Sequence, residues 1–513
     1  MNLGIRMPDA ESPARPSPGL RHRRWELLGL GAVLFLALSL RLEMLPVRTL
    51  WHDEAFSLNV ARRPVGYIWA NLPRVDPHPP GYYVMLRLWT QVFGGDVRSA
   101  RALSVVWGMA AVVLTWGFAR RLAGSASAVL AASLVALNPF QIYNANEIRM
   151  YAPLTATAVL ATWMLHRADN WDRLRDWVGY GAGAAFVLYL SYYAGPLLLA
   201  HGVWMGLRRR WRGLGLGGIT GLLLYLPWIP ALGRSLFANP IPYRDPMRPT
   251  YVLELFATHA FGGHLLGTPG YLRWPGLEWK YQPLLVFPFA VLAAAGIAEL
   301  WRRDRAGAGL LGLCWALPVA VFVLASLGLG REAAYFYHLA HLQPFVAVAV
   351  GAGIVGLQEV VRRASPFLVR AVAATGVLLF LWPAVENLQG NPVYQGFRYD
   401  LAARYLRAHY RPTDVVIYYM GGAQSALHPY FDPPGPELTI DPDVRRWNRE
   451  ALRRHFQEAA RLLRPEHRRV WLVLVAPVPP GSVEDLVKEL ESHRYRRGPL
   501  RDFNGVRVGL LAR

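Results

Sequence analysis

Two adjacent carboxylates follow the first apolar stretch of this 513-residue chain, in the run Leu-Trp-His-Asp-Glu-Ala at 50–55. A carboxylate can serve as a general base or as a nucleophile, and carboxylates kept beside lipid are costly and tend to be functional. The same pair could also belong to an ordinary solvated loop and have no role. Asp53 and Glu54 are therefore the first candidates for catalysis, with His52 beside them as a candidate for substrate binding.

A second polar run, at 76–83, reads Asp-Pro-His-Pro-Pro-Gly-Tyr-Tyr. Proline fixes its own φ and restricts the residue before it, so this run predicts a stiff entry into the apolar helix that follows. Such an entry could hold Asp76 and His78 near Asp53, with Tyr82 and Tyr83 next in the chain. It could equally be a plain proline-rich helix start.

The third polar run, at 138–151, ends in Glu-Ile-Arg-Met-Tyr and contains Glu147, Arg149 and Tyr151. Glu147 and Arg149 could pair with each other as interface anchors. They could instead serve an anionic substrate, because the planar fork of arginine matches the geometry of phosphate oxygens.

The elements that must position these residues are membrane helices. Hydrophobic residues make up 53% of the chain and charged residues 17%, and apolar stretches recur from Trp25 to Pro383. A hydrocarbon core of about 30 Å needs roughly 20 apolar residues per helix, and several stretches reach that length. The net charge of +21 comes from arginines between these stretches, so it requires no nucleic acid. A single cysteine excludes disulfides and thiolate metal sites.

The arginine-rich connections set the predicted topology. The positive-inside rule places them on the inner face, which requires two crossings between each successive pair. Counting the apolar segment His78–Phe93 as a crossing would put every later cluster on the wrong side, so we expect this segment to lie at the interface. The prediction is an inner tail (1–24), a transmembrane domain (25–385) with outer loops at 45–97 and 234–281, and about eleven helices at about 25–44, 98–120, 125–142, 150–166, 176–191, 194–208, 214–233, 283–301, 308–328, 338–358 and 366–384.

Residues 386–513 differ in character, because polar and apolar residues are mixed there. Strand-like runs occur at Val415–Met420, Val470–Ala476 and Val506–Leu511, with helix-like stretches at about 399–409, 446–463 and 483–493. This pattern predicts a C-terminal α/β domain, which the topology places outside the membrane. It carries no nucleotide-binding glycine loop.

Taken together, these motifs resemble the membrane glycosyltransferases that use polyprenyl-phosphate sugars, a class that includes protein O-mannosyltransferases and aminoarabinose transferases of lipid A. The likeness covers about residues 25–210 and implies the GT-C fold. The elements that carry it are Trp-His-Asp-Glu-Ala at 51–55, His-Pro-Pro-Gly-Tyr-Tyr at 78–83, Arg101 with Arg-Arg-Leu-Ala-Gly at 120–124, and Asn-Pro-Phe through Glu-Ile-Arg-Met-Tyr at 138–151.

The resemblance implies that Asp53 acts as general base on an acceptor hydroxyl, which then displaces the lipid phosphate with inversion. Arg149 would stabilise the leaving phosphate. Glu54 and Glu147 would orient sugar or acceptor, although two carboxylates also suit a retaining double displacement. Families of this class carry an Arg-Tyr pair before a late helix, but the stretch at 333–338 lacks the arginine, which makes Arg331 and His338 the candidates to replace it.

Some members of this class bind a metal between the long outer loop and the first one. No spacing in this loop is diagnostic of metal ligands, so we assign none and keep a divalent metal as an open alternative. The loop is expected to form a lid over the entry of the lipid carrier. The residues concerned are His259, His264, Glu254 and Glu278, with Trp274 and Trp279 as interfacial anchors.

The function expected from the sequence is transfer of a sugar from a polyprenyl-phosphate carrier to a protein, lipid or cell-envelope glycan at the outer face of a prokaryotic plasma membrane. One rival is a flippase or transporter of lipid-linked sugars. The apparent lack of buried charge in the middle of the helices speaks against it, because transport pathways usually carry such charges. A second rival is a relative without activity that binds a glycan or a protein.

Overall fold

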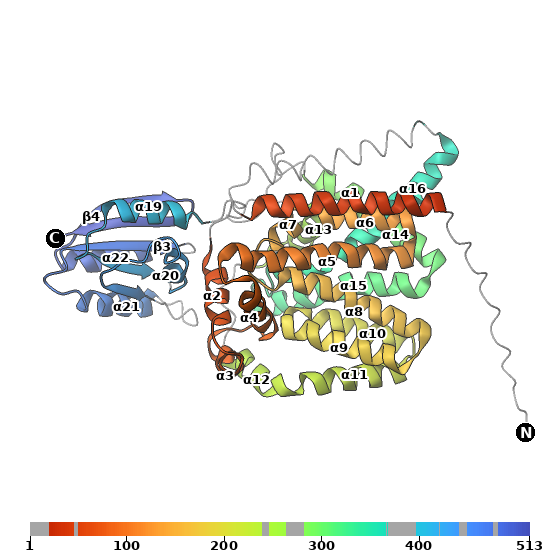
Figure 1. Ribbon diagram of the computed structural model, residues 1–513, viewed down its shortest axis with the longest axis horizontal. Coiled ribbons are helices and arrows are strands. Elements are labelled where there is room, and N and C mark those ends of the chain that lie inside the picture. The colour runs from red at the N-terminus through yellow and green to blue at the C-terminus, as the bar shows by residue number, and fades with distance from the viewer. Residues whose placement is uncertain are drawn as a thin grey trace, which may run out of the picture.

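The computed structural model describes residues 20–45, 50–238, 246–262, 282–365, 367, 397–419, 421–440, 449–475 and 481–513. A helical bundle and a C-terminal α/β region follow each other along the long axis of the molecule (Figure 1). Several predictions lie outside the described residues: the tail before Leu20, the helix at 366–384, and the roles of His264, Glu278, Trp274 and Trp279.

Five of the described helices are long and apolar enough to cross a membrane, so the chain is a helical membrane protein. These spans are Arg24–Met44, Val97–Ala123, Trp211–Arg234, Arg305–Leu329 and Phe336–Arg362. The longer elements of the bundle are α1 (Leu20–Met44), α5 (Val97–Ala123), α6 (Ser125–Leu137), α8 (Tyr151–Trp171), α9 (Leu174–Leu190), α10 (Gly195–Leu207), α11 (Trp211–Tyr225), α14 (Gln282–Arg303), α15 (Arg305–Leu329) and α16 (Gln343–Ala364).

Short helices join or continue the longer ones. They are α2 (His52–Ala61), α3 (Val65–Val75), α4 (Gly81–Phe93), α7 (Pro139–Asn144), α12 (Ile229–Ala238) and α13 (Tyr251–Phe261), with 3₁₀ segments η1 (Tyr192–Ala194), η2 (Leu226–Trp228) and η4 (Phe336–Leu342). The 13 residues of α4 rise only about 20 Å, too little to cross a bilayer. Its first turn packs closely on α9, since a Cβ at Gly81 would lie 2.4 Å from the Tyr189 carbonyl oxygen.

The prediction of one continuous helix at 125–142 is wrong, because the helix is broken at Asn138. The Asn138 side chain accepts hydrogen bonds from the backbone N–H groups of Phe140 and Gln141 and so caps α7. Its amide also donates to the carbonyl oxygens of Thr258 (3.1 Å) and His259 (3.2 Å). Asn138 therefore joins α7 to α13, a buried helix that the sequence did not predict in the outer loop.

Arg41 is a buried charge in the last turn of α1, outside the middle of the helix to which the expectation of no buried charge applies. Its side chain is fully buried in α1, and Nη1 donates to the carbonyl oxygens of Ala37 (3.0 Å) and Ala136 (2.9 Å). Ala136 lies at the C-terminal end of α6, where the helix dipole favours a cation. Arg41 therefore has a structural role as a cap, and it does not mark a transport pathway.

The C-terminal region contains a five-stranded sheet of order β2-β1-β3-β5-β4, in which β1 runs parallel to β2 and β3. β5 is antiparallel to both β3 and β4. The three predicted strands are its centre, whereas both edge strands were missed. The elements are β1 (Val415–Tyr419), β2 (Glu437–Ile440), β3 (Arg469–Val475), β4 (Arg496–Phe503), β5 (Val506–Ala512), α19 (Tyr399–His409), α20 (Gly421–Leu427), α21 (Arg449–Arg461) and α22 (Ser482–Ser492).

Both faces of this sheet are covered by helices. Alternate residues of β1 point to opposite faces, as the pleat requires. Val416 and Tyr418 pack with α19 and α20, whereas Ile417 packs with α21 and α22.

The C-terminal region contacts the bundle at α2. The Leu50 backbone N–H donates to the Tyr430 hydroxyl (2.9 Å), and the rings of Trp51 and Phe397 stack with centroids 6.4 Å apart. The helices α20 and α2 approach closely, because a Cβ at Gly422 would lie 2.6 Å from the Cβ of His52. The first turn of α2 thus lies between the bundle and the sheet.

Candidate active site

Asp53 lies in the first turn of α2 and keeps 31% of its side chain exposed. One carboxylate oxygen lies 3.3 Å from His52 Nε2, and the other lies 3.8 Å from Arg149 Nη2. The Asp53 carboxylate is therefore held by two basic side chains and still open to a ligand. That combination suits a general base.

Glu54, the adjacent carboxylate, is fully buried and lies in a different environment. Its two oxygens accept hydrogen bonds from Arg101 Nε (2.9 Å) and Nη2 (2.7 Å), and one also accepts from the Ile148 backbone N–H (3.1 Å). The other accepts from the Trp51 backbone N–H (3.3 Å), which closes the first turn of α2. Glu54 thus ties α2 to α5 and to the segment that leads into α8.

Arg149 is the buried cation of the site, with 4% of its side chain exposed. Nη1 donates to the hydroxyls of Ser57 (3.5 Å) and Tyr83 (3.4 Å), and Nε has no partner among the described residues. Burial alone would lower the pKa of Arg149, but Tyr83 and then Asp53 raise it well above its ordinary value. Arg149 therefore stays charged and keeps a donor free for an anionic ligand.

Asp76 and His78 form a second carboxylate–imidazole pair. Asp76 Oδ1 accepts from the His78 backbone N–H (2.6 Å) and lies 2.7 Å from His78 Nδ1, while Oδ2 accepts from the Tyr83 hydroxyl (3.1 Å). Burial would raise the pKa of Asp76, but the charge and hydrogen bonds of His78, and then Arg149, bring it below its ordinary value. An ionised Asp76 fixes the proton on Nδ1 of His78. His78 Nε2, which is buried and has no partner among the described residues, is left for a ligand.

His338 joins this pair through an aromatic cluster. Its ring stacks on Tyr193 with centroids 3.9 Å apart, and the His78 ring lies 6.4 Å away. Tyr337 and Tyr151 complete the cluster, at 4.4 and 6.4 Å from His338. Of the two residues expected to replace the missing arginine, His338 is therefore the one placed beside His78.

Arg331 lies apart from this cluster. Its backbone N–H donates to the Ser326 carbonyl (3.2 Å), and its side chain makes no ion pair or hydrogen bond within the described part of the chain.

The remaining expected site residues are buried around these groups. Glu147 is 1% exposed, and its backbone carbonyl accepts from the Ser104 hydroxyl (2.5 Å). Tyr82 is also buried and packs edge-to-face on Tyr83 (5.9 Å between ring centroids). The Tyr151 ring lies 5.2 Å from that of Tyr337. The three sequence motifs thus meet at one end of the bundle.

Tyr399, at the start of α19, is a site residue that the sequence did not reveal. It is fully buried, and its hydroxyl has no hydrogen-bond partner among the described residues. Burial, and then the nearby charge of Asp53, raise the pKa of Tyr399, so the phenol stays protonated and can donate. Only the folded chain brings it to α2, and no local pattern marks it.

Two residues considered for a metal site in the outer loop are engaged elsewhere. His259 Nδ1 accepts from Trp315 Nε1 (3.0 Å), and Glu254 forms an ion pair with Arg248 (2.8 Å). Within the described residues, one group of three side chains offers ligand atoms within 4.8 Å of one another, namely His428, Asp432 and Glu437. This group belongs to the C-terminal region.

Sequence comparisons match part of the chain to transferases. The family described as dolichyl-phosphate-mannose-protein mannosyltransferase matches residues 77–233. An undecaprenyl phosphate-α-4-amino-4-deoxy-L-arabinose arabinosyl transferase from Pseudomonas paraeruginosa is 27% identical in an alignment of 345 residues that covers 63% of this chain and 58% of that one. A Pseudomonas aeruginosa protein of the same description is 28% identical over 266 residues, 48% of this chain and 45% of that one. The chain thus spans about half the length of these relatives.

Solved structures share the fold over nearly the whole chain. ArnT from Cupriavidus metallidurans in the apo state has a TM-score of 0.59 at 14% identity and covers 96% of this chain and 98% of its own. The same protein bound to undecaprenyl phosphate gives 0.57 at 15% identity, covering 95% and 98%. The archaeal oligosaccharyltransferase AglB from Archaeoglobus fulgidus gives 0.55 at 13% identity, covering 88% and 70%.

These comparisons define the class. The chain is an integral membrane protein with the GT-C fold. Within that class it is similar in sequence to glycosyltransferases that take their sugar from a polyprenyl-phosphate carrier, so the resemblance expected from the motifs is confirmed.

Proposed function

We propose that this protein is a membrane glycosyltransferase that transfers a sugar from a polyprenyl-phosphate carrier to the hydroxyl of a protein, a lipid or an envelope glycan. One observation carries the proposal: the accessible carboxylate of Asp53 lies 3.8 Å from Arg149, a buried cation with a free donor. A base and an anion-binding group side by side are what displacement of a lipid phosphate requires.

In the proposed reaction Asp53 removes the proton from the acceptor hydroxyl, and the acceptor oxygen attacks the anomeric carbon of the sugar. The bond from that carbon to the phosphate oxygen breaks, so the anomeric configuration is inverted. The carrier leaves as a phosphate monoester whose negative charge is stabilised by Arg149. A positioned base contributes roughly 10²–10⁴-fold to such a rate.

The other residues position these groups. We assign Glu54 to holding α2 in place, because its carboxylate is enclosed by donors, and Asp76 to orienting His78. In this proposal His338 and the tyrosines at 151 and 193 pack against the sugar or carrier, and Arg331 has no role. Tyr82, Tyr83 and Glu147 line the base of the site.

The proposal places the site and the C-terminal α/β domain on the extracytoplasmic side of a prokaryotic plasma membrane, with about eleven helices. The orientation of the site is supported by α5, whose 27 residues span about 40 Å. Arg101 near the start of α5 binds Glu54, whereas Arg120 and Arg121 lie in its last turn. Because arginine clusters mark the inner face, Asp53 belongs to the outer one. A reporter fused after Arg513 is therefore expected outside, and an inner signal would overturn this orientation.

No step of the proposed reaction is assigned to a metal. The divalent metal that the resemblance allows would draw its ligands from Asp53 and the long outer loop, in which residues 263–281 lie outside the described part of the chain.

The experiment that tests the function is turnover of radiolabelled polyprenyl-phosphate sugars by the purified protein in lipid, with an envelope extract as acceptor. We expect one donor to be consumed and its label to appear in an acceptor, and Asp53→Asn to abolish this transfer. If donors cross the membrane without being consumed, the protein is a flippase. If donors bind and are neither moved nor consumed, it is a binding protein.

A further inference from the structure

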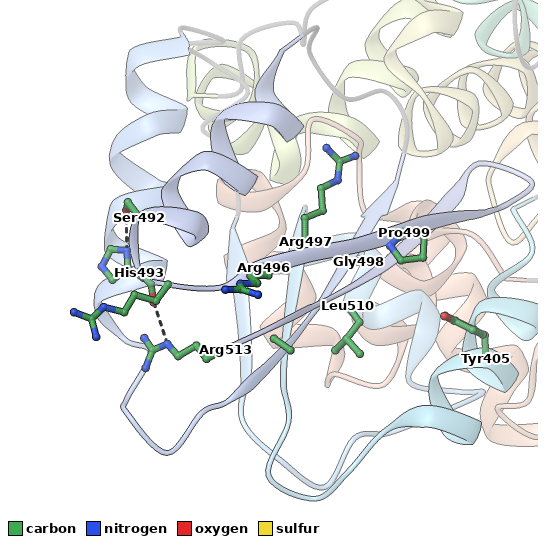
Figure 2. A pocket seen from close by; sticks show the side chains of 11 residues that line it. Tyr405, Ser492, His493, Arg496, Arg497, Gly498, Pro499, Leu510 and Arg513 are labelled. Atoms are coloured by element: carbon green, nitrogen blue, oxygen red, sulfur yellow. Dashed lines mark hydrogen bonds between the residues drawn. The ribbon is translucent and has the colours of Figure 1, made fainter.

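A hollow of about 1060 Å³ lies in the C-terminal region, at the edge of the sheet. Its walls come from the end of α22, the edge strand β4, the end of β5 and Tyr405 of α19 (Figure 2). We call it the arginine groove, after its four arginines Arg494, Arg496, Arg497 and Arg513.

The groove carries positive charge that the structure does not neutralise. All four guanidinium side chains are exposed, and none forms an ion pair with a described residue. Among the described residues that line the hollow, none is acidic. Some arginines of the same region are paired, such as Arg398, which lies 2.8 Å from Asp400. Others, such as Arg453 and Arg454, are exposed and form no ion pair with a described residue. The groove differs because four such arginines line one hollow, an arrangement that suits an anion.

Protection of the sheet edge explains only part of this cluster. Arginine, proline and a bulge on an edge strand prevent pairing with other chains, and β4 has Pro499 and a register shift between Arg497 and Leu500. Figure 2 shows Arg497 projecting to one side of β4, while Arg496 and Arg513 turn toward the loop at His493.

The arginines on the His493 side come from the turn after α22 (Arg494), the start of β4 (Arg496) and the residue after β5 (Arg513). Arg513 Nε donates to the His493 carbonyl (3.0 Å), and its guanidinium lies 4.4 Å from the centre of the Tyr495 ring. Arg494 has a φ of 68°, a left-handed conformation that is uncommon for long side chains. Edge protection requires neither Arg494 nor Arg513, whereas a site for an anion uses both.

The position of the groove excludes the lipid of the protein's own membrane as its ligand. In Figure 1 the long helices of the bundle, α1 and α5, run along the long axis of the molecule, and the C-terminus at Arg513 lies at the end farthest from them. The groove at the end of β5 therefore opens to the aqueous phase, beyond the reach of phospholipid headgroups.

We propose that the arginine groove binds the phosphate groups of a glycan. Guanidinium forks bind phosphate oxygens in pairs, and the volume exceeds that of a single phosphate. The inference rests on the proposed function in one respect, which is the choice of a glycan as the phosphorylated polymer. The groove holds this polymer away from Asp53 and takes no part in the reaction.

The test uses the full chain in nanodiscs of phosphatidylcholine, which has no net charge, at about 0.15 M salt, where the Debye length is about 8 Å. The probes are phosphorylated dextran and unphosphorylated dextran of the same length, with inorganic tripolyphosphate as competitor. We expect phosphorylated dextran alone to bind, and Arg494→Gln with Arg496→Gln to weaken it at least tenfold. The control, Arg453→Gln with Arg454→Gln on the exposed face of α21, removes the same charge and should change binding less than twofold.

Equal losses in the two double variants would show that net charge alone attracts the probe, and the groove would not be a site. Equal binding of neutral dextran, or no binding of either, would also overturn the proposal. Donor turnover without added phosphoglycan is measured in parallel and should be unchanged in both variants. If dextran binding fails while donors are consumed, only this inference fails; if binding succeeds while no donor is consumed, only the proposed function fails.

Discussion

Replacing Glu54 by glutamine should lower the stability of the protein, because the structure gives this carboxylate a structural role and no direct part in the reaction. The carboxylate accepts two hydrogen bonds from Arg101 and one each from the backbone N–H groups of Ile148 and Trp51. A glutamine keeps one acceptor oxygen, and its NH₂ group faces the donors of Arg101. Removing one partner of a buried ion pair costs about 3–5 kcal/mol, because the other charge is left uncompensated.

The measurement is the apparent melting temperature of the purified protein in detergent, for which we expect a fall on the order of 5 °C. The double variant Glu54→Gln with Arg101→Met removes both charges and should be about 2 kcal/mol more stable than the sum of the two single effects predicts. The matched control is Glu299→Gln, which breaks a partly exposed ion pair with Arg303 on α14 and should cost less than about 1 kcal/mol.

Two results would refute this reasoning. If Glu54→Gln melts like the wild type and yet loses most of its turnover, the carboxylate takes part in the reaction itself. If the double variant shows no coupling, Glu54 and Arg101 do not depend on each other in the way the structure indicates.

Three further predictions follow from the same site. Tyr399→Phe removes a buried hydroxyl near Asp53 that has no partner among the described residues, so the melting temperature should not change. Turnover should fall about tenfold, as expected for the loss of a hydrogen bond of about 1.4 kcal/mol to the bound substrate, and normal turnover would exclude a role for this hydroxyl. Because the pKa of Asp76 is lowered in the folded protein, its stabilising effect is present above about pH 4 and is lost as the pH falls further. The difference in melting temperature between wild type and Asp76→Asn should therefore be constant from pH 7 to 5 and shrink below pH 4, and a difference that grows toward acid would contradict the assignment. Asn138→Ala removes the cap of α7 and should cost about 1–2 kcal/mol in chemical unfolding, whereas an unchanged midpoint would show that the cap is dispensable.

The parts of the site carried by local sequence were predictable. Asp53, His78 and Arg149 stand in short motifs of unusual composition, and the structure brings them to one end of the bundle. The centre of the sheet was also predictable, because β1 is buried along its whole length and reads as an apolar run. Its edge strand β2 is partly exposed, β4 is mostly exposed, and both lack such a run, so they were missed.

The different environments of Asp53 and Glu54 could not be foreseen from their adjacency. In a loop the two would be equivalent, but in α2 consecutive side chains point about 100° apart. One carboxylate therefore faces Arg149 and solvent, and the other faces Arg101. The helix that causes this difference was not predicted in the outer connection.

Partners that come from distant segments were equally hidden. In α13, Glu254 and His259 look like polar residues of a loop, and only the fold supplies Arg248 and Trp315 to pair with them. Tyr399 reaches the neighbourhood of Asp53 only through the packing of the C-terminal region on α2. Such contacts follow from tertiary structure and leave no periodic signal in the sequence.

The most direct test of the central claim separates binding from chemistry at Asp53. Turnover and the dissociation constant are measured for one polyprenyl-phosphate sugar, for the wild type and for Asp53→Asn in the same lipid. We predict that turnover falls by at least about 100-fold, within the range that a positioned base contributes, while the dissociation constant changes by less than threefold. Retained turnover, or a loss of binding as large as the loss of turnover, would contradict the assignment of Asp53 as the base.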